Sequence, residues 1–197
     1  AWMAGVAASE WTWSTKFADI DLDGFVDLLI NNGMVGDLMD SDVLANINLP
    51  QFKNAPAYYD SYPKLATPNV AFRNNGDLTF SDVSAEWGVD DANIAHGATL
   101  ADFDNDGDLD LFLSNKDDNK IIPNQLYRNN GNGTFTDVSL IAGISNVGHL
   151  SFCASFFDYD NDGFLDIYIS NDRFVNTNIL YKNNGNGTFT DVSASSG

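Results

Sequence analysis

The stretch "DFDNDGDLDLFLSN", residues 102–115, decides the fold of this chain. Five aspartates occupy its first nine residues, and an apolar run follows directly. Two carboxylates roughly 5 Å apart repel each other by about 3 kcal/mol at an effective dielectric of about 20. Such crowding beside a segment that will be buried predicts that a cation completes the loop.

The same pattern occurs three times, in loop 1 (19–27), loop 2 (102–110) and loop 3 (158–166). In each loop aspartate stands at positions 1, 3, 5 and 9 and glycine at position 6. Hard cations such as Ca²⁺ take six to eight oxygen ligands, and glycine allows the sharp bend. A single copy would leave solvated acidic turns as the alternative. Identical spacing in three copies favours about three calcium sites.

Each predicted site combines the four carboxylates with the backbone carbonyl at position 7. The predicted ligands are Asp19, Asp21, Asp23, Phe25 and Asp27 in loop 1, Asp102, Asp104, Asp106, Asp108 and Asp110 in loop 2, and Asp158, Asp160, Asp162, Phe164 and Asp166 in loop 3.

The residues after the loops exclude an EF-hand. That motif needs a bidentate glutamate at position 12 and a helix on each side of the loop. Position 12 is Ile30, Leu113 or Ile169, each inside a short apolar run that is typical of a strand. The sequence therefore predicts that each loop is the tip of a β-hairpin.

The loops belong to a longer repeat. A second hairpin signal follows each loop, an Asn/Gly turn between apolar residues, as in "QLYRNNGNGTFTDVS" at 125–139. Each unit then closes on a glycine, at Gly88, Gly143 and Gly197, and Gly5 fits the same slot. We predict the tail of a preceding repeat over 1–11, a unit over 12–88 with an insertion at about 33–68, and further units over 89–143 and 144–197.

A unit of about 55 residues with four short strands is typical of a β-propeller blade. Three blades do not close the usual ring of four to eight. We therefore expect an all-β chain of four-stranded antiparallel blades that is a segment of a longer propeller. Open blade edges would also allow it to associate with other chains.

The chain is strongly acidic, with 28 Asp and Glu residues against 9 Lys and Arg and a net charge of −19. This charge argues against nucleic acid or an anionic membrane as a partner. The three loops hold 13 of the 28 acidic residues, so much of the excess has a local cause. No apolar run approaches the roughly 18 residues of a membrane span, and no signal peptide is recognisable.

The insertion at about 33–68 is the most irregular part of the sequence. Its composition suits an ordered loop that binds a partner, or one that packs over a blade edge. It contains Pro50, Pro56, Pro63 and Pro68 and the aromatic residues Phe52, Tyr58, Tyr59 and Tyr62.

Three ring side chains share one repeat position, six residues before the first aspartate of each loop: Trp13, His96 and Phe152. They would stack on a sugar or aromatic ligand, or pack together at the channel mouth, which we favour. The single cysteine, Cys153, is predicted to be a small buried thiol.

Catalytic signals are weak. Asp60, Glu86 and Asp91 are scattered, and His96 and His149 do not share a repeat register, so we do not predict an enzyme. The N-glycosylation sequons at Asn132 and Asn186 fall in tight turns, where Asn-Gly is favoured for its backbone conformation.

The motif at 102–115, followed by "LYRNNGNGTFTDVS" and "AGI", resembles the FG-GAP/VCBS repeat family, which includes the integrin α-subunit propeller and the cartilage acidic protein group. The resemblance implies a seven- or eight-bladed propeller, usually extracellular or at the cell surface, with Ca²⁺ in the hairpin between strands 1 and 2. The integrin "FG-GAP" letters are absent, so no integrin ligand site carries over.

Two function classes follow. The favoured one is a calcium-stabilised extracellular, cell-surface or periplasmic module for adhesion or assembly, with a protein or glycan ligand on the face opposite the calcium loops. The alternative is a lectin or the propeller of a polysaccharide-active enzyme.

Overall fold

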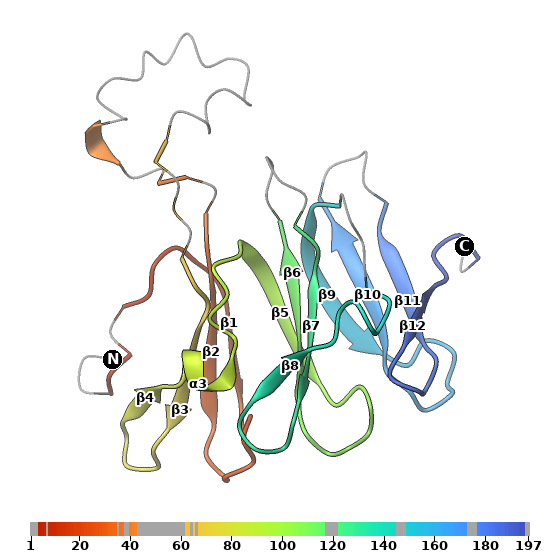
Figure 1. The fold of residues 1–197 in the computed structure, drawn as a ribbon, viewed down its shortest axis with the longest axis horizontal. Coiled ribbons are helices and arrows are strands. Elements are labelled where there is room, and N and C mark those ends of the chain that lie inside the picture. The colour runs from red at the N-terminus through yellow and green to blue at the C-terminus, as the bar shows by residue number, and fades with distance from the viewer. Residues whose placement is uncertain are drawn as a thin grey trace.

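The computed structural model describes residues 4–6, 8–34, 36–37, 40–42, 62–63, 65, 67–116, 122–144, 149–172 and 177–195. Its strands form three four-stranded antiparallel sheets in which sequence neighbours are also sheet neighbours (Figure 1). The predicted all-β class is confirmed, and the sheets are consistent with propeller blades. The residue boundaries of the repeat units stay predictions.

The strands have similar lengths in the three sheets. Sheet 1 contains β1 (Thr12–Ala18), β2 (Asp27–Asn32), β3 (Val70–Asn74) and β4 (Phe80–Asp82), followed by the short helix α3 (Ser84–Trp87). Sheet 2 contains β5 (Ala95–Ala101), β6 (Asp110–Asn115), β7 (Gln125–Asn129) and β8 (Phe135–Asp137). Sheet 3 contains β9 (Ser151–Phe157), β10 (Asp166–Asn171), β11 (Ile179–Asn183) and β12 (Phe189–Asp191).

Two hydrophobic clusters lie between adjacent sheets. Side chains alternate across a strand, so Leu111 and Leu113 of β6 join the core with sheet 1, while Phe112 joins the core with sheet 3. Because both faces of sheet 2 are covered, every residue of β6 is buried. The apolar runs after the aspartate loops are thus explained by two-sided burial.

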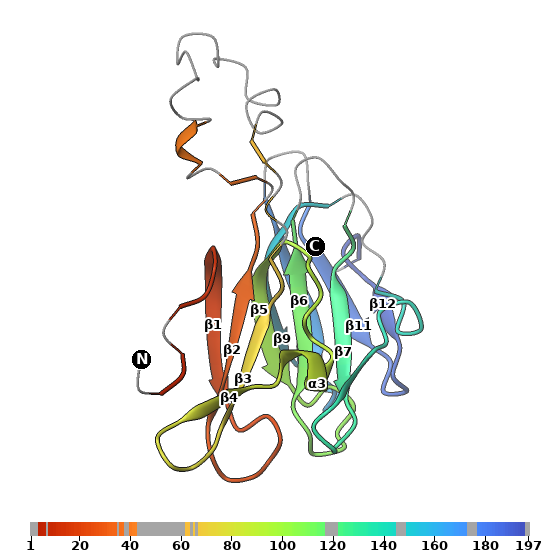
Figure 2. The same cartoon turned by 60° about the vertical axis from the view of Figure 1, so that its left-hand side comes forward.

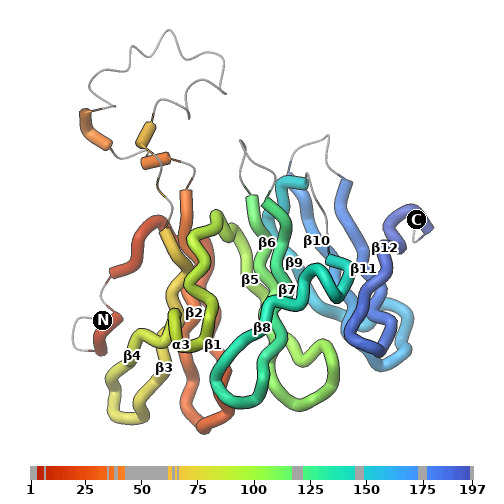
Figure 3. The backbone as a smooth tube through the Cα atoms, viewed as in Figure 1, coloured from red at the N-terminus to blue at the C-terminus, as the bar shows by residue number. Residues whose placement is uncertain are grey.

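The three aspartate loops lie at one end of the sheets. Figures 1 and 2 show them at the lower end, beside the turns between the third and fourth strands. In the tube of Figure 3, the chain enters β5 and β9 from the opposite, upper end. The loops therefore occupy the face opposite the connections that lead from one sheet to the next.

An asparagine clamp closes each connection between the second and third strands. In sheet 2, the Asn115 amide N–H donates to Asn124 Oδ1 at 2.8 Å, and Asn115 Nδ2 donates to the Pro123 carbonyl at 2.8 Å. The same pair of bonds joins Asn32 to Asn69 and Pro68, and Asn171 to Asn178 and Thr177. The end of the second strand is therefore joined to the start of the third in the same way in all three sheets, although the connections differ in length.

The prediction that Cys153 is buried is wrong, since its side chain is exposed. Cys153 lies on the face of β9 that points away from sheet 2, as do exposed Phe157 and, on the next strand, Tyr168. A strand pattern alone does not show whether a further sheet covers that face. In the described part of the chain, nothing covers it.

Gly97 marks the close approach of sheets 2 and 3. A Cβ atom there would lie 2.9 Å from the Phe152 carbonyl oxygen and 3.2 Å from the Cys153 Cα, both backbone atoms. We expect Gly97→Ala to lower the free energy of unfolding by about 1–3 kcal/mol, because β5 and β9 must separate. Urea unfolding measures this.

The matched control is Cys153→Ala at the equivalent position of sheet 3. That side chain is exposed, so its removal should change the free energy by less than about 0.5 kcal/mol. Equal effects of the two substitutions would contradict the close packing of β5 on β9.

Candidate metal centre

Each aspartate loop closes the hairpin of the first two strands in its sheet. The last residue of the first strand pairs with the aspartate at position 9: Ala18 with Asp27, Ala101 with Asp110 and Phe157 with Asp166. This equal register gives the three loops the same frame, as the spacing in the sequence predicts.

Three of the four predicted carboxylates converge in every loop. One oxygen from each of positions 1, 3 and 9 lies within 4.8 Å of the others, which brings them close enough to share one cation. The position-5 aspartates lie outside this group, and the position-7 carbonyls stay predicted ligands. The groups are Asp19, Asp21 and Asp27; Asp102, Asp104 and Asp110; and Asp158, Asp160 and Asp166.

The position-9 aspartate is fully buried and also holds the backbone. In loop 2 the side chain of Asp110 accepts the Phe103 amide N–H at 3.0 Å and the Asn129 amide N–H at 2.8 Å. Asp27 and Asp166 accept the equivalent pairs. These bonds tie the loop to the third strand, so position 9 has a structural role besides any metal.

The carboxylates at positions 1 and 5 shape the loop itself. In loop 2, Asp102 accepts the amide N–H groups of Asp106 and Gly107, and Asp106 accepts that of Asp108. Gly107 has φ of +97°, and a Cβ atom there would meet nothing within 4 Å. Glycine is therefore required at position 6 for the backbone conformation and not for space.

Several carboxylate oxygens in these loops have no hydrogen bond. Among the described residues, Asp19 Oδ1, Asp21 Oδ1 and Asp104 Oδ1 are buried without a partner. A buried carboxylate oxygen without a donor costs free energy. All-oxygen ligands and unsatisfied buried anions are what a hard divalent cation requires, so the residues fit Ca²⁺.

A cation on the third strand, which sequence reasoning missed, faces each loop. Arg73 Nε contacts Asp21 Oδ2 at 2.7 Å, and Lys182 Nζ contacts Asp160 Oδ2 and, at 2.7 Å, Asp162 Oδ2. Arg128 stands at the same repeat position and acts electrostatically on Asp104. The signal in the sequence was the repeated "RNN" or "KNN" at the end of the third strand.

Burial sets the acid–base behaviour of loop 2. Burial raises the pKa of Asp110 to about 7, above the pKa of 3.8 for a free side chain, although its two backbone hydrogen bonds act in the other direction. Burial also raises the pKa of Asp104, with Asp106 and Asp102 adding to the shift. In the metal-free fold a proton thus competes with a cation for this cluster.

This competition predicts that pH changes both the stability of the chelated protein and the stability gained on adding calcium. A folded-state pKa above the unfolded value stabilises the fold below the unfolded pKa, and that stability is lost as the pH rises through about 7. The chelated protein should melt at a lower temperature at pH 8 than at pH 5. The rise in melting temperature on adding Ca²⁺ should be larger at pH 8.

Calorimetry at pH 5 and pH 8, with calcium and after chelation, checks this. Asp110→Ala is the control, and it should reduce the change in melting temperature between the two pH values in the chelated protein. A calcium-induced rise that is larger at pH 5 would contradict the assignment.

The row of rings lies at three equivalent β-bulges. The strand register shifts at Trp13, His96 and Phe152, and a bulge re-aims its side chain. The centroids of Trp13 and His96 are 4.0 Å apart, and those of His96 and Phe152 are 5.7 Å apart. The rings therefore pack on one another, while Phe152 keeps 48% of its surface exposed.

Among the described residues, the acidic candidates Glu86 and Asp91 each have separate structural partners. Glu86 contacts Arg73 at 3.0 Å, and Asp91 accepts hydrogen bonds from Tyr127 and Gln125. His149 lies 3.3 Å from the amide of Asn171. Asp60 lies outside the described residues, as do five of the insertion residues named above: Pro50, Phe52, Pro56, Tyr58 and Tyr59.

Both sequon asparagines support turns. Asn132 Oδ1 accepts hydrogen bonds from the amide and hydroxyl of Thr134, at 3.2 and 2.6 Å. Asn186 and Thr188 repeat this arrangement, and Asp77 replaces asparagine in sheet 1. Aspartate at this turn position accepts the same hydrogen bond as asparagine. The turn geometry therefore accounts for Asn132 and Asn186 without glycosylation.

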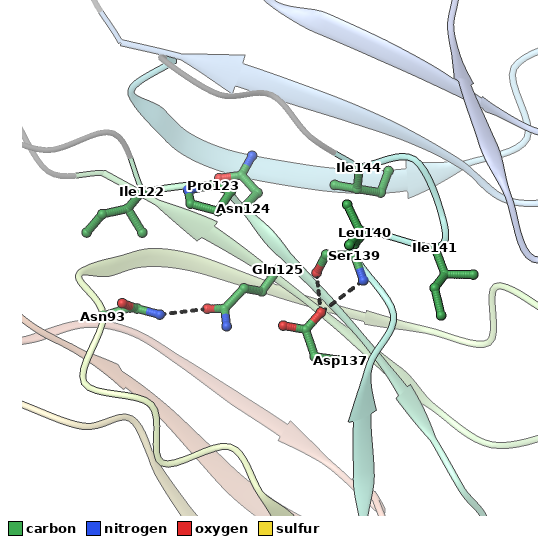
Figure 4. Close-up of a pocket in the computed structure, with 10 residues that line it drawn as sticks. All are labelled: Asn93, Ile122, Pro123, Asn124, Gln125, Asp137, Ser139, Leu140, Ile141 and Ile144. Carbon is green, nitrogen blue, oxygen red and sulfur yellow. Dashed lines mark hydrogen bonds between the residues drawn. The ribbon is translucent and has the colours of Figure 1, made fainter.

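A groove of about 850 Å³ lies between the start of β7 and the turn after β8 (Figure 4). Its walls are mainly aliphatic, and Leu140 and Ile141 are 86% and 79% exposed. Ser139 and Asp137 line it and are hydrogen-bonded at 2.5 Å. Ser193 and Asp191 make the same contact in sheet 3, so this pair is a repeated turn element, not a catalytic dyad.

Repeated four-stranded antiparallel sheets, each with an aspartate-rich loop in its first hairpin, define a class of acidic-loop repeat proteins. A family model described as the FG-GAP-like repeat matches residues 64–113, 106–169 and 158–197, which together extend over more than half of the chain. The chain belongs to the FG-GAP-like repeat family.

Curated relatives agree with this family. The chain is 34% identical over 113 residues to cartilage acidic protein 1 from Homo sapiens, which covers 53% of this chain and 15% of that protein. The corresponding protein from Mus musculus is 30% identical over 104 residues, or 53% and 16%. That from Xenopus tropicalis is 28% identical over 120 residues, or 60% and 18%. The matches thus span less than a fifth of these relatives.

Where residues are described, the structure contains no helix with the length and apolar character needed to cross a bilayer.

Proposed function

We propose that this chain is a calcium-stabilised, non-catalytic interaction scaffold. Each loop binds one Ca²⁺ ion, and the opposite face presents the connecting segments to a protein or glycan ligand. The observation that carries the proposal is the convergence of three carboxylates in each loop, with buried oxygens that lack hydrogen bonds in loops 1 and 2.

The aspartates at positions 1, 3 and 9 would hold the ion, and the position-5 carboxylate and position-7 carbonyl are the further proposed ligands. A bound Ca²⁺ supplies charge neutralisation for carboxylates that otherwise repel each other. Because the loop closes the first hairpin of its sheet, binding free energy becomes folding free energy. The chain's own residues orient the loop through the backbone bonds of positions 1, 5 and 9.

An extracellular, cell-surface or periplasmic setting supports this role. Extracellular modules bind Ca²⁺ with dissociation constants as weak as about 10⁻⁴ to 10⁻³ M. The relatives carry the words cartilage acidic protein in their names. The net charge of −19 again disfavours nucleic acid and anionic membranes.

Two features favour the opposite face as the ligand surface. The asparagine clamps let connections of any length leave the sheets there without disturbing them. The aliphatic groove beside Pro123, with exposed Leu140 and Ile141, adds a concave apolar surface near the same end.

Calcium stoichiometry tests the metal half of the proposal. After dialysis against millimolar Ca²⁺, we expect elemental analysis to find about three ions per chain in excess of the dialysate, and no excess for the triple variant Asp21→Ala, Asp104→Ala, Asp160→Ala. A chain that retains no calcium at millimolar concentration would refute it.

Binding to glycan and matrix-protein arrays tests the ligand half. A captured ligand should be lost with Leu140→Glu and Ile141→Glu. It should be retained with Leu78→Asn, because Leu78 is 90% exposed on the calcium-loop end. The reverse pattern would move the ligand site to the calcium face.

A further inference from the structure

A chain of buried hydrogen bonds joins the metal clusters of neighbouring sheets. At the boundary of sheets 1 and 2 it passes through Asn129, the last residue of β7, which is 2% exposed. Asn129 Nδ2 donates to the Ile20 carbonyl at 3.0 Å, across 109 residues of sequence. Its backbone N–H donates to Asp110 Oδ1 at 2.8 Å.

Ile20 completes the path to the first cluster. It is position 2 of loop 1, and its own N–H donates to Asp27 Oδ2 at 2.9 Å. Three hydrogen bonds therefore connect Asp27 to Asp110 through Ile20 and Asn129. All four residues are at most 2% exposed, so water does not compete for these bonds.

The path repeats between sheets 2 and 3. Asp110 Oδ2 accepts the Phe103 N–H at 3.0 Å, and the Phe103 carbonyl accepts Asn183 Nδ2 at 2.9 Å. The Asn183 backbone N–H then donates to Asp166 Oδ1 at 2.8 Å. The position-9 aspartates of all three loops thus lie on one continuous series of bonds.

Among the residues that the structure describes, the equivalent asparagine in sheet 1, Asn74, makes only the local part of this pattern. Its backbone N–H donates to Asp27 Oδ1, its Nδ2 to the Val26 carbonyl, and its Oδ1 accepts the Gly76 N–H. These bonds stay within sheet 1. Asn74 therefore offers a matched comparison for the cross-sheet bond alone.

We propose that Asn129 and Asn183 are positioning residues that couple adjacent calcium sites, so that an ion in one loop raises the affinity of the next loop. The proposal rests on the calcium function proposed above. An ion fixes the position-9 carboxylate, which holds the position-2 peptide group, and that group's carbonyl accepts the bond from the next sheet. Thermodynamic linkage makes the effect equal in both directions.

A double-mutant cycle tests the coupling. Asp21→Ala empties loop 1, and the calcium affinity of loop 2 is read from the amide NMR signals of Asp106 and Gly107 during titration. Asp21→Ala should weaken binding in loop 2 by about fivefold or more when Asn129 is present. In the Asn129→Ala background it should have no further effect.

Asn74→Ala and Asn183→Ala are the controls at this boundary. Both remove the same side-chain bonds within a sheet, yet both should preserve the effect of Asp21→Ala on loop 2. The second boundary gives an independent cycle, with Asp160→Ala, Asn183→Ala and the same loop 2 signals, and this cycle serves if Asn129→Ala does not fold.

The two proposals fail in different ways. If loop 2 signals do not respond to calcium in the unsubstituted chain, the calcium function itself is wrong. If loop 2 binds calcium with an affinity that Asp21→Ala and Asp160→Ala leave unchanged, the sites are independent and the coupling is refuted. If Asn74→Ala also abolished the coupling, the coupling would depend on the asparagine's hydrogen bonds within its own sheet and not on the bond between sheets.

Discussion

Removal of calcium is expected to lower the melting temperature of this chain by about 15–30 °C. At a Ca²⁺ concentration about 100 times the dissociation constant, one site adds about 2.7 kcal/mol to the free energy of unfolding. Three sites at this degree of saturation would together add about 8 kcal/mol. For a domain of this size each kcal/mol corresponds to about 2–4 °C.

Differential scanning calorimetry with calcium and after chelation measures this shift. The triple variant Asp21→Ala, Asp104→Ala, Asp160→Ala is the control and should melt at one temperature in both buffers. Mg²⁺ should restore less of the stability, because it demands smaller octahedral geometry and gives up its water reluctantly. Identical melting of the unsubstituted chain with and without calcium would contradict the structural role of the ion.

The second large effect separates two aspartates of the same loop. Asp104 Oδ1 is buried without a hydrogen bond, and its neighbouring carboxylates repel it. Asp104→Ala should therefore leave the chelated protein as stable as the unsubstituted chain or more so. In calcium it should lose the contribution of one site, about 2.7 kcal/mol.

Asp110→Ala should behave differently, because it leaves the buried amide N–H groups of Phe103 and Asn129 without their hydrogen-bond acceptor. Each unsatisfied buried donor costs about 1–3 kcal/mol. We expect a loss of about 2–6 kcal/mol even in chelator, with the calcium contribution lost in addition. Urea unfolding of both variants in both buffers provides the comparison.

Equal stability of Asp110→Ala and Asp104→Ala in chelator would mean that position 9 serves the ion alone. A large loss for Asp104→Ala in chelator would mean that position 3 holds the fold without metal. Either result would revise the division of roles within the loop.

The local elements of this protein were predictable from short windows of sequence. The aspartate spacing and the glycine at position 6 specify a loop through the backbone bonds of nearby residues, such as Asp102 to Gly107. The Asn/Gly turns act over similarly short distances. These interactions depend on the chain only within a few residues, so their pattern in the sequence suffices.

Contacts between strands and sheets required the tertiary structure. The third-strand cations reach loops as many as 52 residues away, as Arg73 reaches Asp21, and the repeat position alone did not indicate their partner. The exposure of Cys153 depends on whether a further sheet covers β9, which no property of "SFCASFF" specifies.

The sequence by itself therefore determined the all-β class, the hairpins and the acidic loops of this repeat protein. The reason is that hydrogen bonds within a hairpin link residues that are close in the chain. Only the tertiary structure decided which sheet faces are covered and how one loop is joined to the next. The bond from Asn129 to Ile20 crosses 109 residues, and it exists because the packing of sheet 2 on sheet 1 brings a buried amide to a buried carbonyl.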